Sequence, residues 1–216
     1  MVALITEGTA FDKHGRPFRR RNSRPAVLLL IVLLTAAAVV WTIALTRRPE
    51  VHEAAVCNLP PEGPGPGRPE LGRLVEPSTM MIVLPAKLPD TRVRVLNASG
   101  RGGQAADVAN ALHDLGFPQP AAANDPIYAG GRLNCVGQIR FGETGQAAAA
   151  AVWLVAPCAE LFQDDRSDDS VDLALGTDFT TLAHSQAIDT MLAGLRPDAV
   201  EPSDPALLHT IHSSSC

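Results

Sequence analysis

The chain lacks a surplus of basic residues, and this absence limits the partners it can have. Its 216 residues carry 18 Lys and Arg against 23 Asp and Glu, which gives a net charge of −5. A domain that binds nucleic acid needs a basic surface to meet the phosphate backbone. The composition therefore gives no indication of a nucleic-acid partner.

Sequence signatures of catalysis and of metal binding are also missing. The four cysteines form no C-x-x-C pair, so neither a redox motif nor a zinc site is expected. His184-Ser185 stands outside any G-x-S-x-G elbow, and the acidic run Asp164–Asp172 lacks the spacing of an EF-hand calcium loop. No nucleophile, base and oxyanion donor occur in a recognisable spacing. We therefore expect no enzyme, no cofactor and no metal.

Charge is absent from the twenty residues Ala26–Leu45, AVLLLIVLLTAAAVVWTIAL. At ~1.5 Å per residue, a helix of this length covers the ~30 Å hydrocarbon core of a bilayer. Six Lys and Arg residues precede the run and only Arg47 and Arg48 follow it closely, a bias that keeps the N-terminus in the cytoplasm. Trp41 lies near the outer end of the run, where the amphipathic ring of tryptophan is favoured at the level of the lipid headgroups. We expect a single-pass membrane anchor with everything after Arg48 outside the cytoplasm.

A cleaved signal peptide is the competing interpretation of the same segment. Ala36 and Ala38 form an A-x-A pattern, and the basic residues before the run resemble an n-region. The apolar run continues for seven residues past Ala38, which is longer than a signal peptide requires. This length favours retention as an anchor.

The chain divides into five predicted segments. Prolines and glycines around NLPPEGPGPGRPE exclude a helix or a central strand and indicate a stiff spacer. The basic head suits anionic lipid headgroups. In the tail, Asp204 as N-cap and Pro205 at the first helical position indicate the start of a short helix. His209, His212 and Cys216 could bind a transition metal there, but solvated histidines are the simpler interpretation. The segments are a cytoplasmic head (1–24), a transmembrane helix (25–46), a Pro/Gly-rich spacer (47–75), an extracytoplasmic domain (76–197) and a tail (198–216).

Hydrophobic periodicity predicts the elements of the domain. Strands are expected at 91–97, 134–141 and 170–175, and helices at 102–115, 143–156 and 179–195. Residues 117–123 are extended, and Pro118 and Pro120 confine them to an edge or a loop. The order β-α-β-β-α-β with a trailing helix predicts an α+β fold, a two-layer α/β sandwich. Ala147–Val155 is apolar on nearly all faces, which favours a buried helix over one whose outer face binds a partner chain.

Three segments of the domain resemble the LytR C-terminal domain family. They are VRVLNASGRGGQAADVANALHDLGF, in which a turn with Gly100 and Gly103 joins a strand to a helix, then IRFGETGQAAAA and VDLALGTDF. The similarity spans Arg92 to Phe179. It implies a non-enzymatic role in actinobacterial cell envelopes that supports wall integrity and virulence. In many relatives this domain follows a phosphotransferase domain that attaches glycopolymers to peptidoglycan, and this chain has no room for one.

The clearest candidate for a ligand site is the turn before the first predicted helix, GRGGQA, which satisfies G-x-G-x-x-A. Backbone N–H groups at such a turn can cradle a phosphate. A dinucleotide needs two mononucleotide-binding halves, for which the domain is too small. A tight structural turn is the simplest alternative, and a phosphate or sugar phosphate of the envelope is another. The contacts of such a ligand would come from Asn97, Ser99, Gly100, Arg101, Gly102 and Gly103.

All four cysteines follow the anchor, where disulfides are permitted. Cys135 begins a strand that rises ~20 Å, and the following helix returns by a similar length. Cys158 should then lie level with Cys135, so we expect a Cys135–Cys158 disulfide. Cys57 and Cys216 would remain, and they form a possible second pair, stay free or join two chains.

Two functions from different classes remain. In the first, the domain is an envelope scaffold that binds another wall-assembly protein, or itself, and holds it near the membrane. In the second, it is a binding module for a peptidoglycan or glycopolymer fragment. A scaffold should tolerate Arg101→Ala and fail when exposed apolar residues are replaced, whereas a glycan-binding module should do the reverse.

Overall fold

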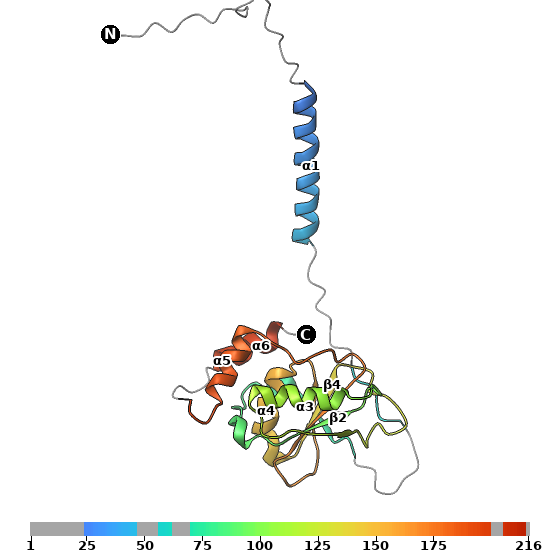
Figure 1. Cartoon of the computed structure of the whole chain (residues 1–216), viewed down its shortest axis with the longest axis vertical. Helices are drawn as coiled ribbons and strands as arrows, with labels where there is room; N and C mark the ends of the chain where they lie inside the picture. Colours follow the sequence, from blue (N-terminus) through green and yellow to red (C-terminus); the bar gives the residue numbers. More distant parts are fainter. Residues whose placement is uncertain (1–23, 47–55, 62–69, 200–204, 215–216) are drawn as a thin grey trace, which may run out of the picture. The chain divides into compact units, whose positions relative to one another are not determined.

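The computed structural model describes residues 24–46, 56–61, 70–199 and 205–214 (Figure 1). It divides into two units, Met1–Val51 and His52–Cys216. The described part of the first unit is a single helix, α1 (Arg24–Thr46). Its window Arg24–Thr42 has a mean hydropathy of 2.4 and is not buried by any other part of the chain. By length and composition α1 can cross a membrane, as the sequence predicts; the predicted cytoplasmic head lies outside the described residues.

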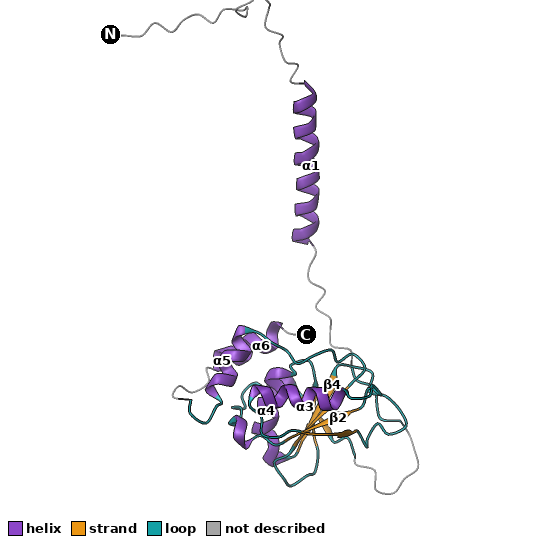
Figure 2. Cartoon of the chain, in the orientation of Figure 1, coloured by secondary structure: helices purple, strands orange, loops and turns teal. Residues whose placement is uncertain are grey.

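A six-stranded mixed sheet forms the centre of the second unit (Figure 2). The strand order is β1-β5-β4-β6-β2-β3. Pairs β1–β5 and β4–β6 are antiparallel, and the other neighbours are parallel. The strands are β1 (Arg73–Val75), β2 (Val93–Asn97), β3 (Ala121–Asn124), β4 (Gly137–Phe141), β5 (Glu160–Gln163) and β6 (Val171–Leu175).

Helices follow β2 and β4 and return the chain to a parallel neighbour in each case. These crossovers are the units β2-α3-β3 and β4-α4-β5. Within α3, the apolar residues Ala105, Val108, Ala109 and Leu112 are buried, as their helical spacing predicts. The helices are α2 (Pro77–Met80), α3 (Gln104–Leu115), α4 (Gln146–Val155), α5 (Gln186–Gly194) and α6 (Pro205–Ser214), with the 3-10 turns η1 (Leu88–Asp90) and η2 (Glu143–Gly145).

The two faces of the sheet carry different cores. One face packs against α3, α4, α5 and α6 in a large apolar cluster that includes Val95, Ile139 and Leu173. The other face has a smaller cluster formed by Leu96, Ala174 and neighbours, under the loop that contains Tyr128. One sheet with its helices on a single face is the α+β sandwich that the sequence predicts, with β3 at an edge as expected.

Helix α4 is enclosed by the domain. Every residue from Ala148 to Val155 is buried, because α5 and α6 pack against the helix on the side away from the sheet. The prediction of a buried helix is confirmed. The alternative, that its outer face binds a partner chain, is wrong.

The predicted boundaries need three corrections. The Pro/Gly-rich spacer does not extend over 47–75, because β1 (Arg73–Val75) belongs to the sheet and the segment 56–61 contacts the domain. The helix predicted at 179–195 starts only at Gln186, where Ser185 accepts a hydrogen bond from the Ile188 N–H at 3.2 Å. Strands β1 and β5 were absent from the prediction. The tail helix begins at Pro205 as expected, although Asp204 lies outside the described residues.

Candidate functional site

The predicted ligand turn connects β2 to α3, and its polar groups bind one another. The Asn97 Oδ1 accepts hydrogen bonds from the Ser99 N–H at 3.1 Å and the Gly100 N–H at 3.2 Å. The Asn97 Nδ2 donates to the Arg101 carbonyl at 2.6 Å. Buried Ser99 accepts from the Arg101 N–H at 3.1 Å. Gly100 and Gly103 have φ of 79° and 82°, the left-handed region that glycine adopts without strain.

Arg101 joins this turn to the segment that follows β6. Its guanidinium donates to the Thr177 carbonyl at 3.2 Å and also to the Phe179 carbonyl. The Gln104 Nε2 donates to the same Phe179 carbonyl at 3.3 Å. The structure therefore brings the six predicted ligand residues together, but it uses the side chains of Asn97, Ser99 and Arg101 to fix the local chain. The arrangement matches the tight structural turn among the three sequence interpretations.

Replacing Arg101 with alanine is expected to lower the free energy of unfolding by about 1–2 kcal/mol, because charge-assisted hydrogen bonds to two carbonyls are lost. Urea denaturation measures the change. Arg92→Ala is the matched control, since Arg92 makes an exposed ion pair with Asp169 at 3.4 Å and should change stability by less than about 1 kcal/mol. Equal stability of the Arg101 variant and the wild type would contradict the structural role of Arg101.

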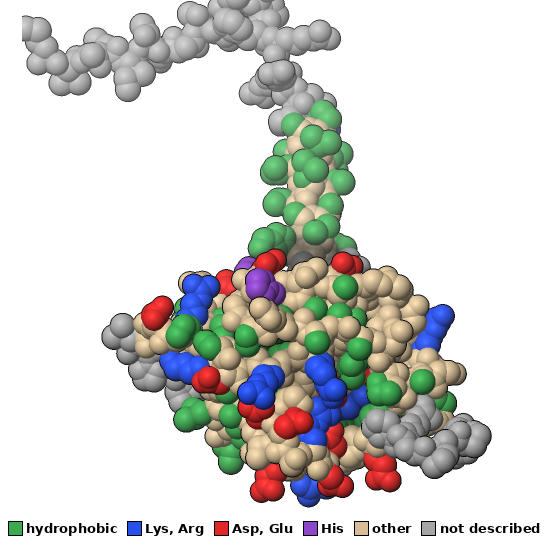
Figure 3. Space-filling view, turned by 60° about the horizontal axis from the view of Figure 1, so that its bottom comes forward, with side chains coloured by type: hydrophobic (Ala, Val, Ile, Leu, Met, Phe, Trp, Pro, Cys, Tyr) green, Lys and Arg blue, Asp and Glu red, His purple; other side chains and the backbone are tan. Residues whose placement is uncertain are grey.

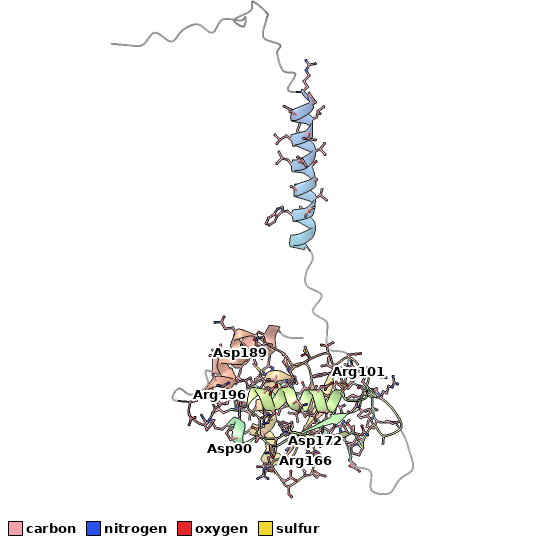
Figure 4. The ribbon with its side chains drawn as sticks, in the orientation of Figure 1. Asp90, Arg101, Arg166, Asp172, Asp189 and Arg196 are labelled. Carbon is pink, nitrogen blue, oxygen red and sulfur yellow. A yellow bond between two sulfur atoms is a disulfide. The ribbon has the colours of Figure 1, made fainter. Side chains whose placement is uncertain are left out.

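A network of charged side chains occupies the second face of the sheet, at the opposite end of β6 from Arg101 (Figure 4). Arg94 binds Asp172 through two hydrogen bonds, at 2.6 and 2.8 Å. Arg166 binds the same carboxylate at 2.8 Å and Asp164 at 2.6 Å. Burial alone would raise the pKa of Asp164, but hydrogen bonds and charge from Arg166 outweigh it and hold that pKa below its ordinary value.

These contacts explain most of the acidic run Asp164–Asp172, which the sequence analysis compared with a calcium-binding loop. Asp164 and Asp172 face arginines, and Asp168 accepts from the Ser170 N–H at 2.9 Å. Within the described ranges, no group of three His, Cys, Asp or Glu side chains is placed to hold a metal ion. Of the tail residues, His209 is exposed while His212 packs inward, and Cys216 lies outside the described residues. On the face drawn in Figure 3, basic and acidic side chains are interspersed.

The disulfide prediction is wrong. Cys135 pairs with Cys57, with their Cα atoms 4.9 Å apart, and this bond also excludes the possible Cys57–Cys216 pair. Cys158 is disulfide-bonded too. Cys135 lies in the small core on the second face of the sheet, whereas Cys158 follows α4, which packs on the other face. The length argument placed both cysteines at one end of the sheet but did not determine the face.

A groove that the sequence analysis missed lies beside β1, between β5, the end of α4 and α6. It has a volume of about 510 Å³, within the range of ligand sites. We call it the apolar groove. Leu74 on β1 is 53% exposed at this site. Its lining includes Leu74, Val75, Met81, Trp153, Leu161 and His212. The sequence signal was weak because these residues come from three distant stretches of the chain, around 74–81, 153–161 and 212, and β1 has only three residues.

His212 gives this region a titratable group. Its ring stacks on Trp153, with the ring centres 3.5 Å apart, and neither ring nitrogen has a hydrogen-bond partner among the described residues. Burial lowers the pKa of His212 to about 4, because desolvation disfavours the charged imidazolium.

The depressed pKa of His212 predicts a loss of stability in acid. The unfolded chain binds a proton at this histidine near pH 6.5, whereas the folded domain does so only near 4. The free energy of unfolding should therefore fall as the pH drops from about 6.5 towards 4. Urea denaturation across this range should show a smaller fall for His212→Phe, which keeps an aromatic ring on Trp153. The control is His209→Phe at an exposed position of the same helix, which should show the same fall in stability as the wild type. The same pH dependence in all three proteins would contradict this account.

An apolar helix able to cross a bilayer, followed by a disulfide-bonded α+β domain, defines the class of membrane-anchored extracytoplasmic proteins. Residues 90–179 match the family model described as LytR cell envelope-related transcriptional attenuator. The chain is 68% identical, over the full length of both proteins, to the cell envelope integrity protein Cei of Mycobacterium tuberculosis. The chain belongs to the LytR C-terminal domain family and is related to Cei within it.

A solved structure agrees with the fold. The crystal structure of the soluble domain of a conserved hypothetical secreted protein from Mycobacterium marinum aligns with a TM-score of 0.67 and 68% sequence identity. The alignment covers 68% of this chain and 99% of that domain. The relative's domain was therefore obtained as a folded unit without an anchor.

Proposed function

We propose that this chain is a single-pass membrane protein whose extracytoplasmic domain is a non-enzymatic scaffold that supports cell-envelope integrity. Helix α1 and the basic bias before it support a cytoplasmic N-terminus. The Cys57–Cys135 disulfide suits an oxidising compartment. The relationship to Cei supports the envelope role. A contribution to virulence, which the family resemblance implies, stays a prediction.

The apolar groove is the single observation that favours a scaffold over a polymer-binding module. An apolar concavity with an exposed leucine suits an apolar segment of another protein better than it suits a hydrated glycan. The polar turn at Asn97–Gly103, where a sugar phosphate was an alternative to a purely structural turn, already uses its side chains for internal hydrogen bonds. We therefore place the interaction surface at the groove.

A pulldown with the oxidised domain, residues 56–216, tests this function. The domain is presented to detergent-solubilised membranes and, separately, to protein-free cell wall from the same cells. We expect capture of a defined membrane protein, unchanged by Arg101→Lys, and no retention on wall. Retention on protein-free wall without capture of a membrane protein would overturn the scaffold proposal.

The alternative function, binding of a peptidoglycan or glycopolymer fragment, has its best support at the charged network. Arg94, Arg166 and Ser170 line a polar cavity of about 500 Å³ together with four carboxylates, and charged side chains of both signs can hydrogen-bond to the hydroxyl groups of a glycan. If wall retention is observed, Arg94→Gln should reduce it, since this substitution removes the charge at the exposed side of the cavity. Retention unaffected by this change would place polymer binding elsewhere.

A further inference from the structure

The groove has a charge pattern that restricts what can occupy it. Its ionisable side chains are Glu76, Glu160, His209 and His212, and no Lys or Arg is found among its described lining residues. Glu76 is exposed and Glu160 is half-buried. An apolar floor with carboxylates at its margin attracts a cationic partner and disfavours an anionic headgroup.

The groove also lies beside the point where the chain from the anchor joins the domain. The Cys57 N–H donates to Glu160 Oε1 at 3.0 Å, and Glu160 lines the groove. Asn58 continues this attachment, because its Nδ2 donates to the Arg132 carbonyl at 3.0 Å and its carbonyl accepts from the Tyr128 hydroxyl at 2.6 Å. Together with the Cys57–Cys135 disulfide, these contacts fix the entry of the chain at this end of the sheet.

From the apolar floor and the acidic margin, we propose that the apolar groove docks a segment of another membrane protein, a short apolar peptide flanked by Lys or Arg. The occupant rests its apolar side chains on exposed Leu74 and Pro77 and on half-buried Met81, and its cations face Glu76 and Glu160. This inference rests on the proposed scaffold function and specifies its binding surface and the chemistry of its partner.

A peptide-display selection tests the proposal with a defined probe. The oxidised domain, residues 56–216, is used to select binders from a library of random peptides; the soluble domain of the Mycobacterium marinum relative, its residues 71–217, was obtained without an anchor. We expect enriched peptides to carry a short apolar run next to Lys or Arg. Synthetic versions should bind Leu74→Asp at least about tenfold more weakly than wild type, because the exposed apolar contact is lost and docking apolar side chains there would desolvate a carboxylate.

Matched variants separate the groove from the rest of the surface. Leu84→Asp is the control, since Leu84 is 65% exposed but does not line the groove. The pair Glu76→Gln and Glu160→Gln retains size and hydrogen bonding, and should weaken binding of the basic peptides by about tenfold through loss of two charge contacts. High salt should reduce wild-type binding towards the level of this pair.

Three results would overturn the proposal. They are enrichment of peptides without a basic flank, equal binding by Leu74→Asp and Leu84→Asp, and binding of phosphatidylglycerol vesicles through Leu74 with no peptide selected. If the pulldown captures a membrane protein equally with wild type and Leu74→Asp, the scaffold function stands and the groove proposal fails. Retention on protein-free wall, without capture of a membrane protein, would contradict both the scaffold function and the groove proposal.

Discussion

Replacing Asp125 with alanine is expected to remove about 3–5 kcal/mol from the free energy of unfolding, because it leaves a buried arginine without its counter-charge. Asp125 and Arg140 are almost fully buried, and their carboxylate and guanidinium groups are 2.9 Å apart. Asp125 Oδ1 also accepts a hydrogen bond from the Ile127 N–H at 2.7 Å. The substitution therefore also removes a contact that holds the Tyr128 loop on the second face of the sheet. Urea denaturation of the oxidised domain measures the loss.

Asp165→Ala is the control for Asp125→Ala. Asp165 is exposed in the acidic loop, and its removal should change stability by no more than about 0.5 kcal/mol. Asp125→Asn should fall between the two, since the amide oxygen still accepts the backbone hydrogen bond but carries no charge. A loss of less than about 1 kcal/mol for Asp125→Ala would contradict a structural role for this ion pair.

Removing the Cys57–Cys135 disulfide is the second large effect. The bond closes a loop with a sequence separation of 78 residues, and the chain-entropy model assigns about 4–5 kcal/mol to a loop of this size. The double variant Cys57→Ser, Cys135→Ser should therefore be strongly destabilised. It should also release the segment 56–61 from the domain, because the remaining contacts of that segment are a few hydrogen bonds.

Limited proteolysis separates these two consequences. In the native oxidised protein, the chain around Asn58 should resist cleavage, since its side chain and carbonyl are hydrogen-bonded to the domain. The double variant should be cut there first while the sheet stays intact. Asn58→Ala with the disulfide retained is the control and should keep the segment attached. Equal cleavage of the double variant and the wild type would mean that the disulfide does not hold the segment 56–61 on the domain.

The sequence predicted the elements whose periodicity extends over several residues. Strands β2, β4 and β6 and helix α3 follow from alternating or helical apolar spacing, and α4 follows from a run that is apolar on nearly all faces. Strands β1 and β5 have three and four residues, too few for any period to be recognised. Their omission moved the domain boundary and concealed the apolar groove, because β1 forms one of its walls.

The predicted ligand turn illustrates what a motif leaves undetermined. The spacing of Gly100 and Gly103 correctly indicated a turn between a strand and a helix. It contained no information on the partner of Arg101, which binds carbonyls at Thr177 and Phe179, far away in the sequence. Whether polar groups at such a turn face a ligand or their own chain depends on tertiary contacts of this kind. The pairing of Cys57 with Cys135 depends in the same way on which face of the sheet each cysteine occupies.

The account depends most directly on the membrane anchor, because a scaffold must hold its partner at the membrane. The decisive measurement is uptake of a normally excluded dye by cells that lack the gene and carry one of three versions. These are the full chain, the domain on an unrelated transmembrane helix in place of α1, and the domain on a cleavable signal peptide that releases it. The account predicts that both anchored versions restore dye exclusion and that the released domain does not. Full restoration by the released domain, at the same level of folded protein, would contradict it.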